Sequence, residues 1–273
     1  MGESLPLRFL YRTAPGRMVL KLLVRPGLSR AVGAFLDSGL SRPLIRPFLR
    51  SNQIDLTGIA IPEGGFPSFN ACFSRRREET PFDPEPAHFC SPCDSLLSVV
   101  PIDANSTFQI KHTAYSLEAL LEDAALARDF QGGTALIFRL TPAHYHRYHF
   151  ADGGRILRQV TIPGVLHCVR PIAMEQFPVY IRNSRAYTLY DSEQFGRLVQ
   201  MEVGALLVGR IVNHPDPGRF VRGQEKGWFA FGGSTIVVLA RKNALLINDC
   251  ILDGLQGNQE IPVRLGQWIG TKP

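Results

Sequence analysis

The chain has 273 residues, of which 45% are hydrophobic, 20% charged and 10% aromatic. This composition excludes collagen-like, low-complexity and intrinsically disordered proteins, and the length suffices for a proper core in one large or two small domains. The formal net charge of +6 is unevenly distributed, because residues 1–50 carry nine basic and two acidic side chains, a net charge of +7. Residues 51–273 are therefore close to neutral, and the chain divides into a basic N-terminal arm and a near-neutral body.

The N-terminal arm mixes basic with apolar residues. Arg or Lys interrupts its apolar residues every few positions, so no run approaches the ~20 apolar residues that span a bilayer, and no secretory signal peptide is expected. Pro15-Gly16, Pro26-Gly27 and Pro43 divide the arm into short amphipathic helices. Such helices favour an anionic membrane interface. Packing on the body is the alternative reading, whereas nucleic-acid binding is disfavoured because few stacking aromatic residues lie between the basic ones.

After Asn52 the basic amphipathic pattern gives way to short segments bounded by Gly and Pro, and Pro62–Pro67 is typical of a linker. We therefore predict a helical, basic, membrane-associating segment over residues 1–60 and a second domain over residues 61–273. A helix is expected over residues 116–130, with Ser116 as its N-cap. The predicted strands include 135–140, 179–182, 198–212 and 235–240, the last of them buried on both faces. The fold class is therefore α+β: N-terminal amphipathic helices followed by a mainly β catalytic domain with one inserted helix.

The five cysteines are odd in number and irregularly spaced, which is typical of a reduced, intracellular chain. Cys90 and Cys93 form a CxxC sequence, but no second CxxC accompanies it, and it does not open a helix after a strand. A zinc site or a thioredoxin-type redox site is therefore disfavoured.

Three histidines crowd the segment from Pro142 to Phe150: His144, His146 and His149. On a strand, His144 and His146 would share one face while His149 points to the other, unless the chain turns near Arg147. The residues alone leave three readings open, which are acid–base catalysis, a metal site and packing.

Two further segments contain groups that could react. Gly232-Gly233-Ser234-Thr235 stands before a Val/Ile/Leu run, where a bulge or a turn is the plain reading. The other reading is a Gly–Ser bond whose serine hydroxyl attacks the preceding carbonyl, which a residue without a Cβ leaves accessible. Asp94, in Ser91-Pro92-Cys93-Asp94-Ser95, either caps its own turn or orients a distant histidine.

Taken in chain order, these segments resemble the phosphatidylserine decarboxylase family, whose members are pyruvoyl-dependent proenzymes that cleave themselves. The resemblance covers almost the whole chain, and one departure is Ser95, where the family usually has glycine. It is carried by Leu10-Tyr11, Pro15-Gly16-Arg17, Phe69-Asn70, Phe73-Ser74-Arg75-Arg76, Arg139-Leu140-Thr141-Pro142, Tyr145-His146-Arg147-Tyr148-His149, Val203–Gly209 and Phe231-Gly232-Gly233-Ser234-Thr235.

The resemblance implies a site and a reaction. The residues that match the family's site are Asp94, His146, His149, Gly233 and Ser234, whereas the resemblance gives His144 no role. Ser234 attacks the Gly233 carbonyl, the chain is cut between residues 233 and 234, and Ser234 becomes a covalent pyruvoyl group. His149 is the base of that step and Asp94 its orienting partner. The pyruvoyl group then forms a Schiff base with phosphatidylserine, which is decarboxylated to phosphatidylethanolamine with His146 as proton donor.

The resemblance also implies partners and a location. The substrate lies in a membrane, so we expect a peripheral protein on the cytoplasmic side of the cell membrane, at an anionic surface and without nucleic acid. The two cleaved chains should stay associated, no metal is implied, and the oligomeric state is left open, a homodimer included. The competing functions are a pyruvoyl-dependent decarboxylase of a soluble amino acid and a metalloenzyme built on the histidine cluster.

Overall fold

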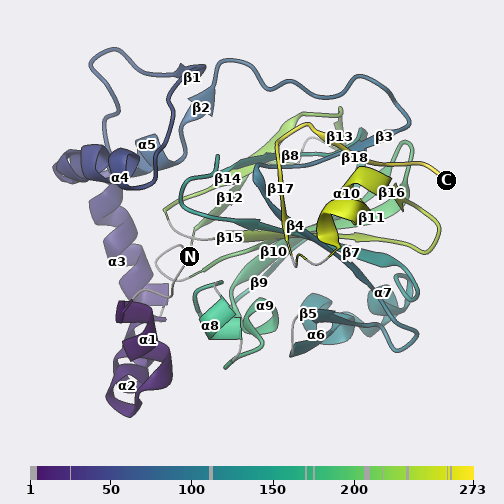
Figure 1. Ribbon diagram of the computed structural model, residues 1–273, viewed down its shortest axis with the longest axis horizontal. Coiled ribbons are helices and arrows are strands. Elements are labelled where there is room, and N and C mark those ends of the chain that lie inside the picture. Colours follow the sequence, from purple (N-terminus) through teal and green to yellow (C-terminus); the bar gives the residue numbers. More distant parts are fainter. Residues whose placement is uncertain are drawn as a thin grey trace.

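The computed structural model shows an α+β protein in which N-terminal helices lie along one side of a body built mainly of strands (Figure 1). This arrangement confirms the fold class that the sequence predicts. The residues that the structure describes are 5–24, 26–110, 113–169, 171–174, 176–205, 210–216, 218–231, 234–256, 258 and 260–273.

Short helices separated by tight breaks form the N-terminal part, as the Pro–Gly pairs predict. Thr13 caps the second of them, because its Oγ1 accepts a hydrogen bond from the Gly16 N–H at 3.0 Å, and Pro15 lies in the first turn. The helices are α1 (Leu5–Arg12), α2 (Ala14–Leu23), α3 (Pro26–Asp37), the 3₁₀ helix η1 (Gly39–Leu44), α4 (Ile45–Ser51) and α5 (Phe69–Phe73).

One face of these helices packs on the body. The Tyr11 ring is fully buried, and its hydroxyl accepts a hydrogen bond from the Cys168 N–H at 2.9 Å. Val24 accepts another from the Leu166 N–H at 3.1 Å. Tyr11, Leu20 and Val24 belong to the same apolar cluster as strand residues of the body. The apolar core is therefore continuous from the arm into the body.

The largest sheet of the described residues has eight antiparallel strands. Their spatial order is β13 (Arg219–Phe220), β9 (Gly154–Ile162), β10 (Arg185–Ser192), β11 (Gly196–Val203), β15 (Ser234–Ala240), β7 (Thr134–Leu140), β4 (Ser95–Pro101) and β17 (Ile261–Val263). Every residue of β15 is buried. Val237 and Leu239 enter one apolar cluster, while Ile236 and Val238 enter another, so both faces of the strand are covered as predicted.

Smaller sheets and helices complete the body. The sheet that concerns the site consists of β12 (Ile211–Asn213), β14 (Glu225–Phe229) and β8 (Arg147–His149). A second contains β16 (Leu246–Ile247), β18 (Trp268–Thr271) and β3 (His88–Cys90). The remaining elements are the pair β1 (Ile59–Ala60) and β2 (Arg76–Arg77), the pair β5 (Thr107–Ile110) and β6 (Thr113–Ser116), and the helices α8 (Pro171–Met174) and α10 (Asp249–Leu255).

The predicted helix over residues 116–130 is wrong in its continuity. Ser116 is an N-cap as expected, but the segment forms two short helices, α6 (Leu117–Leu121) and α7 (Ala124–Arg128). Glu122 between them adopts a left-handed backbone with φ of 52°. Asp123 then caps α7 by accepting a hydrogen bond from the Leu126 N–H at 2.9 Å. The left-handed residue and the second cap together divide the helix.

Two predicted strands also differ from the structure. Residues 179–182 form helix α9 (Val179–Arg182), because Pro178 starts a turn that the Asn183 N–H closes on the Val179 carbonyl at 2.9 Å. The predicted strand 198–212 is divided between two sheets: β11 ends at Val203 in the large sheet and β12 begins at Ile211 in the small one. A helix long and apolar enough to cross a membrane is not found among the described residues.

Tyr11→Ala tests whether helix α1 shares the core of the body. Removing a fully buried aromatic ring typically lowers the free energy of unfolding by about 3–5 kcal/mol. Urea unfolding followed by circular dichroism measures the loss. Leu5→Ala in the same helix is the control, because Leu5 is 79% exposed and its loss should change stability by less than about 0.5 kcal/mol. Equally small effects of both variants would contradict the shared core.

Candidate active site

Ser234 is the first residue of β15 and is completely buried. Its backbone is paired opposite Leu140 of β7, which fixes the start of the strand inside the sheet. Its Oγ has no hydrogen-bond partner within the described ranges. Burying a hydroxyl without a hydrogen-bond partner costs free energy, because its hydrogen bonds to water are not replaced. Such a group needs an explanation, and a reaction at this oxygen would provide one. Gly233, the other half of the predicted cleavage site, lies outside the described residues.

The segment that leads to Ser234 is held by successive backbone hydrogen bonds. The Phe229 N–H donates to the His146 carbonyl at 2.9 Å, and the Ala230 N–H donates to the Arg210 carbonyl at 3.1 Å. The Phe231 N–H donates at 3.1 Å to a side chain, the Oδ1 of Asn70. The histidine segment and the segment before Ser234 are therefore neighbours.

His146 is fully buried beside this segment. Its ring lies on that of Phe73, with centroids 3.9 Å apart, and Phe73 also contacts Phe231 edge-on. The Nδ1 atom is 2.9 Å from the His144 carbonyl. Because a carbonyl oxygen can only accept, Nδ1 carries a proton. His146 is therefore held in one orientation.

His149 lies at the end of β8 and is 3% exposed. Burial lowers its pKa to about 4, so the imidazole is neutral at physiological pH and can accept a proton. Its Nδ1 has no hydrogen-bond partner among the groups that the structure describes. The backbone of His149 is fixed, since its N–H donates to the Pro92 carbonyl at 2.9 Å.

Asp94 is joined to the histidine segment through its turn. Pro92 of the same turn accepts the hydrogen bond from His149, but within the described residues no hydrogen bond joins the Asp94 carboxylate to the His149 ring. The carboxylate instead accepts two hydrogen bonds from the Arg77 guanidinium, at 3.3 and 2.5 Å, and one from the Leu265 N–H at 2.8 Å. The structure thus brings together the two segments but not the two side chains.

The third histidine serves its own turn. The Nδ1 of His144 accepts a hydrogen bond from the Thr141 N–H at 3.0 Å, which agrees with its having no assigned role. Burial lowers the pKa of His144, and the nearby Asp94 charge opposes that shift. No group of three or more His, Cys, Asp or Glu side chains within the described ranges is placed to hold a metal ion.

Arg75 and Arg77 contact candidate-site residues, and sequence reasoning did not single them out. Arg75 is buried and donates to the carbonyls of Ala143 and His144, at 3.2 and 3.3 Å, so it holds the turn before His146. Arg77 is the counter-ion of Asp94. The available signal was the family-like stretch around Phe73-Ser74-Arg75-Arg76, which identifies basic residues but not the groups that they bind.

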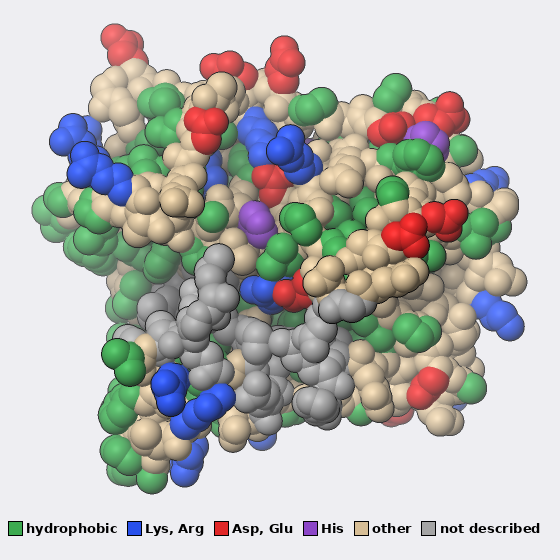
Figure 2. All heavy atoms as spheres, in the orientation of Figure 1, with side chains coloured by type: hydrophobic (Ala, Val, Ile, Leu, Met, Phe, Trp, Pro, Cys, Tyr) green, Lys and Arg blue, Asp and Glu red, His purple; other side chains and the backbone are tan. Residues whose placement is uncertain are grey.

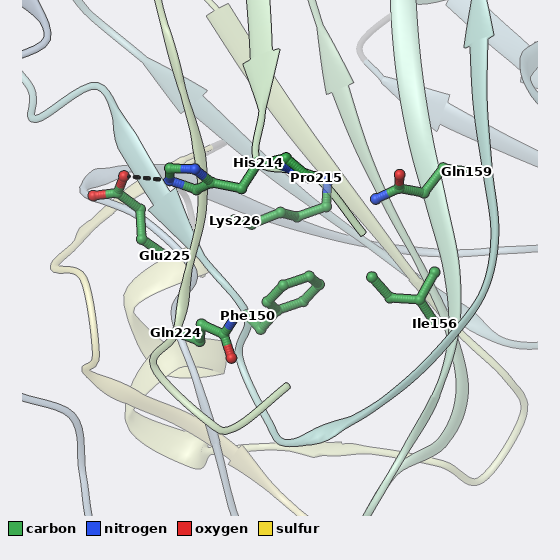
Figure 3. Close-up of a pocket in the computed structure, with 8 residues that line it drawn as sticks. All are labelled: Phe150, Ile156, Gln159, His214, Pro215, Gln224, Glu225 and Lys226. Carbon is green, nitrogen blue, oxygen red and sulfur yellow. Dashed lines mark hydrogen bonds and ion pairs between the residues drawn. The ribbon is translucent and has the colours of Figure 1, made fainter. Parts of the chain in front are cut away.

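A hollow beside β14 is lined by Phe150, Ile156, Gln159, His214, Pro215, Gln224, Glu225 and Lys226 (Figure 3). Several of its polar groups already have partners. Lys226 donates to Glu202 at 2.7 Å and to Asn213 at 3.1 Å, while Glu225 lies 2.8 Å from the His214 Nε2. The Lys226 amine is therefore held in a buried ion pair.

Comparisons with known proteins agree with this reading of the segments. A family model described as phosphatidylserine decarboxylase matches residues 69–271. Phosphatidylserine decarboxylase proenzyme 2 of Clostridium acetobutylicum is 39% identical over 267 residues, which are 97% of this chain and 91% of that protein. The phosphatidylserine decarboxylase proenzyme of Ruminiclostridium cellulolyticum is 39% identical over 271 residues (97% and 90%), and that of Clostridium perfringens is 35% identical over 268 (96% and 91%). Because the likeness extends over nearly the whole of both chains, this chain belongs to the phosphatidylserine decarboxylase family of carboxy-lyases.

Proposed function

We propose that the chain cuts itself between Gly233 and Ser234 and then decarboxylates phosphatidylserine to phosphatidylethanolamine. The observation that carries the proposal is the buried Ser234 hydroxyl, which begins β15 and has no hydrogen-bond partner in the described part of the chain. Family membership supports the substrate.

In the cutting step, Ser234 Oγ attacks the Gly233 carbonyl carbon, and the peptide bond is exchanged for an ester. A base then removes the Ser234 Cα proton and the Cβ–O bond breaks, which releases the Gly233 carboxylate. Hydrolysis of the dehydroalanine that remains releases ammonia and leaves the pyruvoyl group. His149 is the base for the serine proton, which its neutral state at physiological pH supports. Asp94 is the orienting partner of His149. To reach that ring, the carboxylate exchanges its bonds with Arg77 for one with the imidazole.

In the decarboxylation, the pyruvoyl group supplies an electron sink next to the amine of the substrate. The proposed task of His146 is to deliver a proton to the substrate's α-carbon after CO₂ leaves. The fixed orientation of its ring between Phe73 and the His144 carbonyl supports this assignment, since a proton donor works best when it is positioned.

The sheet supports continued association of the two cleaved chains. Residues 234–273 contribute β15, which pairs with β7 and β11, and β17 and β18, which pair with β4 and β3. Cutting before Ser234 removes none of these strand pairs, so the shorter chain stays inside the large sheet.

We place the chain on the cytoplasmic side of an anionic membrane, and the N-terminal helices support a peripheral position there. Figure 2 shows hydrophobic and basic side chains next to one another over α1 and α2. Met18 and Leu22, one turn apart on α2, are 72% and 56% exposed. Arg17 and Lys21 on the same helix are exposed as well, so apolar insertion and attraction to anionic lipids can act together.

Ser234→Ala tests the cutting step. The variant should remain one chain of full mass without decarboxylase activity, because it lacks the nucleophile, whereas the unmodified protein should give two chains with a blocked N-terminus on residues 234–273. Intact-mass spectrometry measures both. Thr188→Val is the matched control, since Thr188 has a buried hydroxyl in the same sheet that lacks a partner among the described groups. A full-length, unblocked chain from the unmodified protein would refute self-cleavage.

His146→Ala and His149→Ala separate the two proposed roles. His149→Ala should stay a single chain, because no base activates Ser234. His146→Ala should be cut into two chains and yet turn over phosphatidylserine about 10²–10⁴-fold more slowly, the usual contribution of a positioned acid. Electrophoresis and a vesicle-based decarboxylase assay report the two steps. The reverse pattern would exchange the roles, and full maturation with full activity in both variants would disprove them.

Replacing Met18 and Leu22 together by Ser tests the membrane surface. Each side chain is worth roughly 1.5–3 kcal/mol when fully buried, so the double variant should bind anionic vesicles at least about tenfold more weakly. Cosedimentation with phosphatidylserine-containing vesicles measures the binding. Val221→Ser is the control, because Val221 is 68% exposed but lies on the body. Unchanged binding of the double variant would exclude this face of α2.

A further inference from the structure

Asn70 on α5 joins the N-terminal helices to the segment before Ser234. Its side chain is buried and both of its polar atoms are used. The Oδ1 accepts a hydrogen bond from the Phe231 N–H at 3.1 Å, and the Nδ2 donates to the Asp37 Oδ1 at 2.9 Å. One amide thus contacts both the last residue of α3 and a backbone group three positions before the reacting serine.

At Phe231 the backbone N–H donates to a side chain and no longer to a backbone carbonyl. Phe229 and Ala230 donate to backbone carbonyls, whereas the next N–H, that of Phe231, has the Asn70 side chain as its acceptor. A buried backbone N–H needs such an acceptor, because leaving it unpaired is costly. Asn70 is therefore the last described hydrogen-bonded anchor of this segment before Ser234.

Arg210 links Asp37 to the segment before Ser234, so these hydrogen bonds form a closed network. Its guanidinium donates to the Asp37 Oδ2 at 2.9 Å, and its carbonyl accepts the Ala230 N–H at 3.1 Å. The Phe231 ring packs edge-on against Phe69, at a centroid distance of 4.8 Å, so helix α5 holds the segment by an apolar contact too. The end of α3 and the approach to Ser234 are thus fixed relative to each other at several points.

We propose that Asn70 is a positioning residue for self-cleavage, and that it makes cutting depend on the docking of α3 through Asp37. The inference rests on the proposed cut between Gly233 and Ser234. Attack of a hydroxyl on the preceding carbonyl is sensitive to displacements of about 1 Å, and Asn70 limits them by fixing the Phe231 peptide. Asp37 in turn fixes the Asn70 amide, since only an acceptor at that position can receive the Nδ2 proton.

The experiment exchanges the two side chains. Asn70→Asp keeps an acceptor for the Phe231 N–H but places two carboxylates against each other, so cutting should slow by about tenfold or more. Adding Asp37→Asn should restore the rate to within about threefold, because the amide at position 37 then donates to the carboxylate at position 70 and its carbonyl still accepts from Arg210. Cell-free synthesis followed by timed electrophoresis measures the conversion of one chain into two.

Two further measurements exclude a merely structural effect. Asn105→Asp makes the same chemical change in an exposed turn and should leave the rate of cutting unaltered. In a Ser234→Ala background, which cannot be cut, thermal unfolding shows whether Asn70→Asp has damaged the fold. Cutting of Asn70→Asp at the normal rate overturns the inference, and so does a double variant that stays as slow as the single one. Absence of cutting in the unmodified protein would overturn the proposed function instead.

Discussion

Strand β15 is bound on both sides, by β7 and by β11, and this two-sided pairing fixes the position of the proposed reaction. The backbone of Ser234 cannot shift without breaking its register with Leu140, so one end of the reacting bond is rigid. The approach from residues 229–231 is held by the carbonyls of His146 and Arg210 and by Asn70. The geometry of the site is therefore set by two anchored segments, residues 229–231 and strand β15.

Burial sets the electrostatics of this site. His149 and Ser234 are both removed from water, and burial keeps the imidazole uncharged by lowering its pKa to about 4. Burial also leaves the serine hydroxyl without solvent, so a proton acceptor must come from the protein. Burial thus leaves the Ser234 hydroxyl without a partner among the described groups and the His149 imidazole uncharged.

Much of the fold could be predicted because it follows from local rules. The Val/Ile/Leu run after Ser234 is a strand buried on both faces, and Pro15 and Pro26 each lie in the first turn of a helix. The failures arise at single residues whose local effect the apolar pattern does not reveal. The left-handed Glu122 divides the predicted helix, although the apolar period continues past it. The apolar residues of 179–182 suit a strand as well as a helix, and Pro178 decides in favour of the helix.

For the candidate site, the sequence predicts which reactive residues are present but not which groups they pair with. Motifs identify Asp94, His146, His149 and Ser234, because the types and order of reactive residues can be read along one chain. They do not reveal that the Asp94 carboxylate binds Arg77 and the Leu265 N–H, which lie 17 and 171 residues away. Both arginine and neutral histidine can donate a hydrogen bond to the same carboxylate oxygens, so the arginine competes with the imidazole for this partner. Whether Asp94 can orient His149 is therefore decided by a residue outside the motifs.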